Sequence, residues 1–300
     1  MKIATLGSLG HIGKPLVTEL VNSGHDVTVV SSNPDRKKSI EELGAKAAIG
    51  SVMDNEFLDT TFSGKDAVYT MTPFAAGSYF DDRFDVTGSL LKLADAYKAA
   101  LEKSDVQKVV HLSSIGADKE SGNGILSSYY PVEMTIKSLP EEIAITILRP
   151  VGFYYNLYGY LDSIRKQGVI ATNYGGDGKW PWVSPLDIAQ VAFEELTSGE
   201  KERKVRYVAS DEVSCNEIAS VLGNAIGKQD LKWILISDEQ VLAGLTSSGM
   251  NPDVARGFVE MNAATRSGHI FEDYHRNQPV LGKVKIRDFA KEFALVYANQ

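Results

Sequence analysis

The chain has 300 residues, of which 43% are hydrophobic and 23% are charged, with a formal net charge of −8. These values are ordinary for a globular protein with a sizeable core, and the length allows one large domain or one domain with a smaller companion. The acidic total and the lack of a Lys/Arg block exclude direct nucleic-acid binding as an expected function.

Strand and helix patterns alternate along the first half of the chain. The expected strands are 2–6, 26–30, 47–49, 66–70, 109–113 and 144–148. The expected helices are 14–23, 34–43, 55–62, 84–102 and 131–139. This alternation predicts an α/β fold with a doubly wound parallel sheet. Such sheets bind their ligands at the carboxyl ends of the strands, so the residues that follow each strand are candidates for a site.

After residue 150 the pattern loosens into an aromatic run at 153–160 and a loop-like segment at 174–182. Helices are expected at 185–196, from 214 to about 226, from 237 onward, and at 251–266 and 286–297. Strands are expected at 205–209 and 231–236. This half predicts a smaller, mostly helical lobe that packs over the sheet.

Cys215 is the only cysteine, so no internal disulfide can form, which fits a reducing compartment. No apolar run approaches the ~20 residues of a membrane-spanning helix. The first strand pattern begins directly after Met1, which leaves no room for a signal peptide. We therefore expect a cytoplasmic protein without a membrane partner. The histidines lack ligand-like spacing with Cys, Asp or Glu, so no metal site is expected.

A glycine-rich stretch follows the first strand and opens the first helix. Its glycines have the spacing G-x-x-G-x-x-G, and the residues expected to contact a ligand are Gly7, Ser8, Leu9, Gly10, His11, Ile12 and Gly13. Glycines let the backbone N–H groups approach a phosphate, and the following helix directs its positive end at the same point. This context predicts a dinucleotide site, and an ordinary strand–helix turn is the alternative.

The end of the second strand indicates which dinucleotide is bound. NAD sites typically carry an acidic residue there to hold the ribose hydroxyls. Here the residues expected to contact the cofactor are Ser31, Ser32, Asn33 and Arg36, with two lysines following. Hydroxyls and cations suit a 2′-phosphate, which favours NADP(H) over NAD(H). Two alternatives remain open: the cations only solvate a helix face, or Asp35 turns inward to hold NAD.

An ordered set of segments resembles the NmrA-like group, whose members are atypical short-chain dehydrogenases/reductases. The segments are 7–13, 70–73, 109–114, 148–154 with Asn156, and 182–189. The resemblance covers about residues 2–200. It implies a Rossmann domain, NAD(P) binding and a small C-terminal substrate lobe. Members include NADPH-dependent quinone and azo-dye reductases and proteins that bind NADP without turnover.

The chain is expected to divide into two domains. The dinucleotide-binding Rossmann domain is expected to comprise 1–152 plus about 183–210, and the substrate-binding lobe 153–182 plus 211–300. The strand ends are expected to complete the cofactor site, with Thr72 and Ser113 flanking the nicotinamide. The expected contacts at the strand ends are Thr70, Met71, Thr72, Pro73, Ser113 and Val151.

The usual catalytic couple of short-chain reductases, Tyr-x-x-x-Lys, is missing. Tyr129 is followed four residues later by Glu133 and Tyr130 by Met134, and no tyrosine has a lysine at this spacing. The remaining catalytic candidates are Ser113, Tyr129 and Tyr130. Without a neighbouring cation, the pKa of either tyrosine is expected to stay near 10. For each tyrosine, the alternative to a catalytic role is a packing role at the start of the helix. Glu133 and Lys137 are expected to form a helix ion pair.

This absence favours a particular reaction. Reduction of an ordinary carbonyl needs a placed proton donor, whereas a hydroquinone anion is stabilised by its own ring and takes a proton from water. Hydride transfer to a quinone therefore requires mostly positioning. The predicted function is an NADPH-dependent oxidoreductase with an aromatic small-molecule substrate, which contacts Phe74, Phe153, Tyr154, Asn156 and Trp180. The alternatives are a non-catalytic NADP-sensing regulator and, less favoured, an isomerase or epimerase.

Overall fold

The computed structural model describes residues 1–73 and 76–299 and is built around a seven-stranded sheet. In spatial order the strands are β10 (Arg203–Val208), β6 (Ala144–Pro150), β5 (Lys108–Leu112), β4 (Ala67–Met71), β1 (Lys2–Thr5), β2 (Asp26–Ser31) and β3 (Lys46–Ile49). Every neighbouring pair is parallel. The chain order reverses between β1 and β4, which is where a doubly wound sheet binds its ligand.

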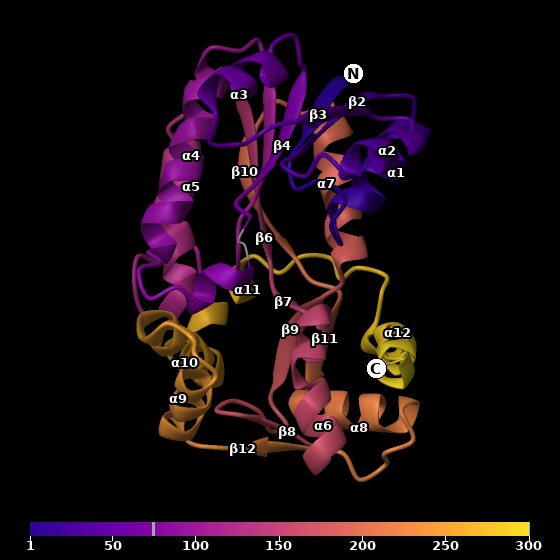
Figure 1. The fold of residues 1–300 in the computed structure, drawn as a ribbon, viewed down its shortest axis with the longest axis vertical. Helices are drawn as coiled ribbons and strands as arrows, with labels where there is room; N and C mark the ends of the chain where they lie inside the picture. Colours follow the sequence, from indigo (N-terminus) through magenta and orange to yellow (C-terminus); the bar gives the residue numbers. More distant parts are fainter. Residues whose placement is uncertain (74–75, 300) are drawn as a thin grey trace.

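Helices cover both faces of this sheet (Figure 1). One face carries α1 (Gly13–Asn22), α2 (Arg36–Glu42) and α7 (Pro185–Thr197). The other carries α3 (Asn55–Phe62), α4 (Val86–Glu102) and α5 (Tyr129–Lys137). Because both faces are covered, the strands are apolar throughout, and Val109 and Val110 of β5 are both fully buried. The predicted doubly wound Rossmann fold is confirmed.

The C-terminal region is helical, as expected, and also contains two small sheets. The strand expected at 231–236 forms one strand of these sheets, whereas the other four strands were not expected from the sequence. The strands are β7 (Gly152–Phe153), β9 (Lys179–Val183) and β11 (Asp211–Ser214) in one sheet, and β8 (Val169–Thr172) and β12 (Lys232–Leu235) in the other. The helices are α6 (Leu161–Gln167), α8 (Cys215–Ala225), α9 (Asp238–Ser247), α10 (Pro252–Ser267), α11 (Glu272–Arg276) and α12 (Ile286–Asn299). Four 3₁₀ segments, η1 (Ala76–Phe80), η2 (Gly124–Ser128), η3 (Tyr154–Tyr160) and η4 (His269–Phe271), complete the described chain.

This region has a core of its own, in which Trp182, Phe289 and Phe293 pack with aliphatic residues of α6 and α8. The domain limits drawn from the sequence stay a prediction.

Side-chain caps account for several helix starts. Asp85 accepts a hydrogen bond from the Gly88 N–H, which begins α4 two residues later than expected. The capping box of Ser237 and Gln240 is present at the start of α9.

Candidate functional site

The glycine-rich loop connects β1 to α1 and leaves no room for side chains at two of its glycines. Gly7 has φ +93°, and a Cβ there would lie 2.3 Å from Met71 Sδ. A Cβ on Gly13 would lie 2.2 Å from the backbone oxygen of Ser8. Gly10 is exposed, and its added Cβ would meet only the Gly7 oxygen at 3.5 Å, an ordinary contact. Glycine is therefore required at 7 and 13 to build the loop.

Ser8 lies at the tip of this loop in a conformation that non-glycine residues seldom adopt, with φ +52°. Its Oγ is buried and has no hydrogen-bond partner within residues 1–73 and 76–299. Among the described residues no side chain caps the N-terminus of α1, where Ile12 occupies the cap position. A buried hydroxyl without a partner beside uncapped helix N–H groups suits a phosphate, so this loop fits the dinucleotide that its spacing predicts.

At the end of β2, hydrogen bonds within the turn engage two of the four predicted contacts. Ser31 Oγ is 3.2 Å from the Asn33 nitrogen, and Asn33 Oδ1 accepts from the Asp35 N–H at 2.9 Å. Ser32 and Arg36 are exposed. In the part of the chain that the structure describes, the Arg36 guanidinium has no ion-pair partner, whereas the two following lysines pair with glutamates one turn later on α2.

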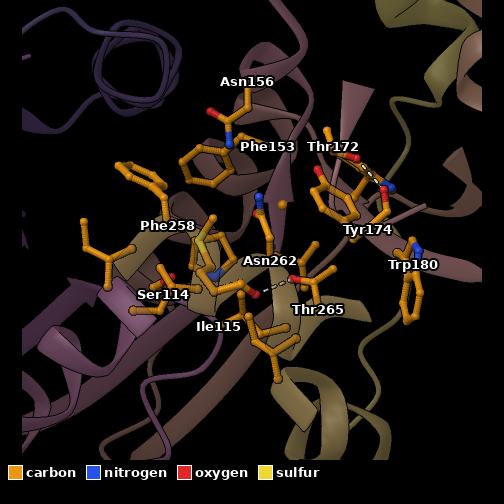
Figure 2. Close-up of a pocket in the computed structure, with 18 of the residues that line it drawn as sticks. Ser114, Ile115, Phe153, Asn156, Thr172, Tyr174, Trp180, Phe258, Asn262 and Thr265 are labelled. Atoms are coloured by element: carbon orange, nitrogen blue, oxygen red, sulfur yellow. Dashed lines mark hydrogen bonds between the residues drawn. The ribbon is translucent and has the colours of Figure 1, made fainter. Parts of the chain in front are cut away.

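A cavity of about 990 Å³ lies at the carboxyl ends of β4 and β5, where the C-terminal lobe packs over the sheet. Its walls come from both parts of the chain, as the labelled side chains in Figure 2 show. Nine of the predicted site residues lie here: Met71, Thr72, Pro73, Ser113, Tyr129, Val151, Phe153, Asn156 and Trp180. The cavity adjoins the glycine loop, because Met71 lines it and also contacts Gly7.

Three predicted site residues lie elsewhere, and a fourth, Phe74, lies outside the described residues. Thr70 is fully buried within β4, where its Oγ1 lies 2.9 Å from His111 Nδ1. Tyr130 does not line the cavity. Tyr154 is also fully buried, with its ring stacked between Trp182 and Phe289 at centroid distances of 6.5 and 5.4 Å. The expected substrate contact at Tyr154 is therefore corrected to a core position.

The next residue, Tyr155, lines the cavity instead. Its ring stacks on His11 of the glycine loop at a centroid distance of 5.0 Å and an interplanar angle of 20°. It also lies 5.1 Å from the Phe153 ring. The aromatic run therefore divides between the core of the C-terminal lobe and the wall that joins the cavity to the glycine loop.

Ser113 is held by a buried charge network behind the cavity wall. Its Oγ donates a hydrogen bond of 2.7 Å to Glu133 Oε1, and the Glu133 side chain is fully buried. Arg149 contacts the same carboxylate through Nε at 2.9 Å and Nη2 at 2.7 Å. Lys137 Nζ is 2.8 Å from Glu133 Oε2, which confirms the predicted helix ion pair.

This network changes what Ser113 can do. A carboxylate only accepts hydrogen bonds, so the Ser113 proton is committed to Glu133 and the oxygen is left as an acceptor. A role for Ser113 as a proton or hydrogen-bond donor to a substrate is therefore corrected. The neighbouring Ser114 lines the cavity, and its hydroxyl has no hydrogen-bond partner among the described residues.

Tyr129 lies at the start of α5 and lines the cavity near two further phenols, those of Tyr79 and Tyr155. Burial raises the pKa of the Tyr129 phenol above its ordinary value of 10.0, and the neighbouring phenols add to the rise. The nearby Thr72 side chain opposes the shift without cancelling it. Tyr129 is therefore neutral at physiological pH and able to donate a hydrogen bond.

The cavity lining carries no charged side chain within the described residues. Many of its side chains are aromatic, and the polar ones are hydroxyls and amides. One wall was missed by sequence reasoning. It is formed by one face of α10, with contributions from α9, and its α10 residues are Phe258, Met261, Asn262 and Thr265. Their i, i+3, i+4, i+7 spacing was visible in the sequence, but it indicates only that one helix face is buried and not that this face lines a cavity.

The described residues contain neither a metal-binding cluster nor a membrane-spanning helix. No group of three or more His, Cys, Asp or Glu side chains is arranged to hold a metal ion, for the residues that the structure describes. Within the same residues, no helix combines the length and the apolar character needed to cross a bilayer.

Comparison with known proteins identifies relatives of the whole chain. An NAD(P)H azoreductase of Xenophilus azovorans is 25% identical over 297 residues, covering 99% of this chain and 98% of its own. The NADP(H)-complexed triphenylmethane reductase of Citrobacter sp. has a TM-score of 0.75 at 18% identity, covering 98% and 100% of the two chains. The NADPH-dependent quinone oxidoreductase QOR2 of Escherichia coli, complexed with NADPH, has a TM-score of 0.73 at 18% identity, covering 97% and 99%.

A family model described as NAD(P)H-binding matches residues 7–199, from the first glycine of the loop to just past the end of α7. The match therefore includes the glycine loop, the end of β2 and the strand ends that line the cavity. Together with the Rossmann sheet, it shows that this chain belongs to the NAD(P)H-binding family.

Proposed function

We propose that the protein is an NADPH-dependent oxidoreductase that passes a hydride to a neutral, planar aromatic acceptor such as a quinone. The observation that carries this proposal is the cavity of about 990 Å³, which is aromatic and uncharged among the described residues and adjoins the glycine loop. A volume of this order accommodates a ring system together with the reacting end of a cofactor. Relatives named as azoreductase and quinone oxidoreductase support the same chemistry.

NADP(H) is the proposed cofactor. Ser8 and the N–H groups at the start of α1 would hold the pyrophosphate, and Ser32 with Arg36 would hold the 2′-phosphate. Arg36 suits this role because its guanidinium has no ion-pair partner among the described residues, unlike the two lysines after it. A guanidinium binds a phosphate with charge-assisted, often bidentate hydrogen bonds.

When bound, the cofactor supplies the hydride. The Ser113 oxygen, fixed as an acceptor, suits the amino group of a nicotinamide carboxamide, with Thr72 and Val151 beside it on the cavity wall. Phe153 and Tyr155 supply flat apolar surfaces for an aromatic acceptor. The contribution of these residues is positioning, because holding the two reactants in contact removes much of the barrier to hydride transfer.

The acceptor's developing negative charge falls on its own oxygen. Tyr129 and Ser114 offer neutral hydroxyl donors at the cavity, and a neutral hydroxyl stabilises an oxyanion without giving up its proton. The quinone gains the hydride and becomes a hydroquinone monoanion, which then takes one proton from water. A raised tyrosine pKa suits this reaction, because the phenol keeps its proton and donates a hydrogen bond while water supplies the proton.

The lining also predicts discrimination by charge. No carboxylate of the described residues faces a cationic dye in this cavity, and no Lys or Arg faces a sulfonate or the diphosphate of a nucleotide sugar. An unpaired charge is expensive to bury, so ions should be poor substrates. The same argument disfavours the isomerase or epimerase reading.

The test is a steady-state assay with NADPH and three acceptors: a neutral naphthoquinone, a cationic triphenylmethane dye and a sulfonated azo dye. We expect the highest kcat/KM for the quinone by at least about tenfold, since burying one unpaired charge costs more than the 1.4 kcal/mol that corresponds to this factor. A preference for either ion would refute the acceptor class. Tight NADPH binding without turnover of any acceptor would instead support the sensing alternative.

A further inference from the structure

On the α10 wall, the hydrogen-bond network fixes which end of one side-chain amide is the oxygen and which is the nitrogen. Asn262 lines the cavity, and Figure 2 shows it among the side chains that face the cavity. We propose that Asn262 presents its carbonyl oxygen to the substrate as a hydrogen-bond acceptor, so that the cavity selects neutral aromatic acceptors carrying an O–H or N–H group. This inference rests on the proposed function, because it specifies the substrate of the same cavity.

The orientation is set outside the cavity, at the carboxylate of Asp238. Arg266 contacts this carboxylate through Nη1 at 2.8 Å and Nη2 at 3.2 Å. The pKa of Asp238 is lowered by the Arg266 contact and by a hydrogen bond from Asn173. Asp238 is therefore ionised at neutral pH, and an ionised carboxylate has no proton to donate.

Asn173 transmits this constraint. Its side chain is fully buried, and its Nδ2 lies 2.8 Å from Asp238 Oδ1 and 3.2 Å from the backbone oxygen of Val259. Both partners only accept, so the atom that faces them must be the amino group. The reversed amide would place its single oxygen against both a carboxylate and a backbone carbonyl in a buried setting, which is strongly unfavourable.

The other end of Asn173 is consequently its carbonyl. Asn173 Oδ1 accepts a hydrogen bond of 2.8 Å from Asn262 Nδ2. Reversing Asn262 would set its oxygen against this second oxygen, so its amino group stays toward Asn173 and its Oδ1 stays on the other side. No described residue donates to Asn262 Oδ1, and this atom is absent from the buried unpartnered oxygens. It is therefore open to the space that Asn262 lines.

Polar groups on this wall and beside it are already engaged within the protein. Thr172 Oγ1 accepts from the Trp233 indole and donates to the Tyr174 carbonyl. Gln240 Oε1 accepts from the Ser237 N–H in the capping box of α9. On the α10 wall, the Asn262 carbonyl is an acceptor whose direction the fold fixes without using it, which makes it a specificity-determining group.

The test measures binding rather than turnover. Two 1,4-naphthoquinones that differ only in a hydroxymethyl or a methoxymethyl substituent are titrated into the full-length protein saturated with NADP⁺, which cannot reduce them. Binding is followed by quenching of tryptophan fluorescence, since Trp180 and Trp182 line the cavity. We expect the hydroxymethyl compound to bind about tenfold more tightly, the factor for one well-made hydrogen bond.

Two variants locate the source of this preference. In Asn262→Leu, the ratio of the two dissociation constants should fall to about one. Asp238→Asn removes the fixed acceptor, allows both amides to reverse, and should lower the ratio without abolishing binding. It also serves if the leucine variant does not fold.

The outcomes separate this inference from the function on which it rests. Equal affinities in the wild-type protein, or an unchanged ratio in Asn262→Leu, would overturn the role of Asn262 and leave the acceptor class standing. Failure of both quinones to bind would overturn the acceptor class, and this inference with it.

Discussion

Replacing the buried carboxylate behind the cavity wall, in the variant Glu133→Gln, tests how the charge network supports the fold. Glutamine keeps one oxygen for Ser113 Oγ and Arg149 Nε, at 2.7 and 2.9 Å in the wild type. Its amino group would then face two donors, Arg149 Nη2 and Lys137 Nζ. Removing one partner of a buried pair costs about 3–5 kcal/mol. Because Arg149 retains Asp273 at 3.0 Å, we expect the lower end, about 3 kcal/mol.

The assay is equilibrium unfolding in urea, followed by circular dichroism and extrapolated to water. Lys137→Met is the matched control, because Lys137 contacts the same carboxylate but its own side chain is 35% exposed. This variant should lower the free energy of unfolding by less than about 1 kcal/mol. The double variant Glu133→Met/Arg149→Met removes both buried charges and should be less destabilised than Glu133→Gln. A loss below about 1 kcal/mol in Glu133→Gln would refute the assignment of this pair as a buried, mutually dependent unit.

The same network predicts an acid dependence of stability. Burial raises the pKa of Glu133, but hydrogen bonds and the charges of Arg149 and Lys137 lower it further, to below its usual value of 4.5. A carboxyl whose folded-state pKa is lowered stabilises the protein at pH values above its unfolded-state pKa, and this contribution disappears as the pH falls through the folded-state pKa. The stability difference between wild type and Glu133→Gln should therefore be constant near neutrality and shrink below about pH 4.5. A difference that grows in acid would contradict the lowered pKa.

Three further predictions concern the cofactor and the acceptor. Arg36→Ala should raise the dissociation constant of NADPH by about tenfold and leave that of NADH unchanged in calorimetric titration, whereas Lys38→Ala, which removes a residue already paired on its helix, should change neither. Gly13→Ala should weaken NADPH binding by more than about tenfold and lower the melting temperature, because its Cβ would lie 2.2 Å from a backbone oxygen, while Gly10→Ala, at 3.5 Å, should be tolerated. Tyr129→Phe should lower kcat for quinone reduction by about tenfold, because one hydroxyl donor to the acceptor is removed. The pH profile of kcat should stay unchanged between about pH 6 and 9, since the pKa of the wild-type phenol is raised above 10.0. A titration step that is lost in the variant would show that the phenol ionises during the reaction.

Local patterns in the sequence were sufficient for the sheet and its glycine loop. The strand and helix periodicities are set by neighbouring residues, and the loop follows from where Gly7 and Gly13 fall relative to β1 and α1. The aromatic run was harder because it forms η3, where a shift of one residue turns a side chain by about a third of a turn. Tyr154 faces the core and Tyr155 the cavity for this reason, and no periodicity in the run distinguishes them.

The role of Ser113 could not be read from its position at the end of β5. It depends on which atom its proton contacts, and that atom belongs to Glu133, 20 residues later on α5. Glu133 in turn is held by Arg149 at the end of β6. The helix spacing predicted the Lys137 contact but gave no indication of the arginine, since only the parallel pairing of β5 with β6 brings these residues together.

The missing acid–base couple and the buried pair have a common structural basis. Four residues after Tyr129, where a reductase with the usual couple carries a lysine, this chain carries Glu133, and the Arg149 side chain compensates its charge away from the cavity. A lysine there would lower the pKa of the tyrosine, whereas the carboxylate is neutralised by Arg149 and leaves the Tyr129 pKa raised. The charges are thereby used to fix Ser113 as an acceptor and to keep the cavity lining neutral. A reaction that needs a strong proton donor is poorly served by this arrangement, and one that needs two flat reactants held in contact is well served.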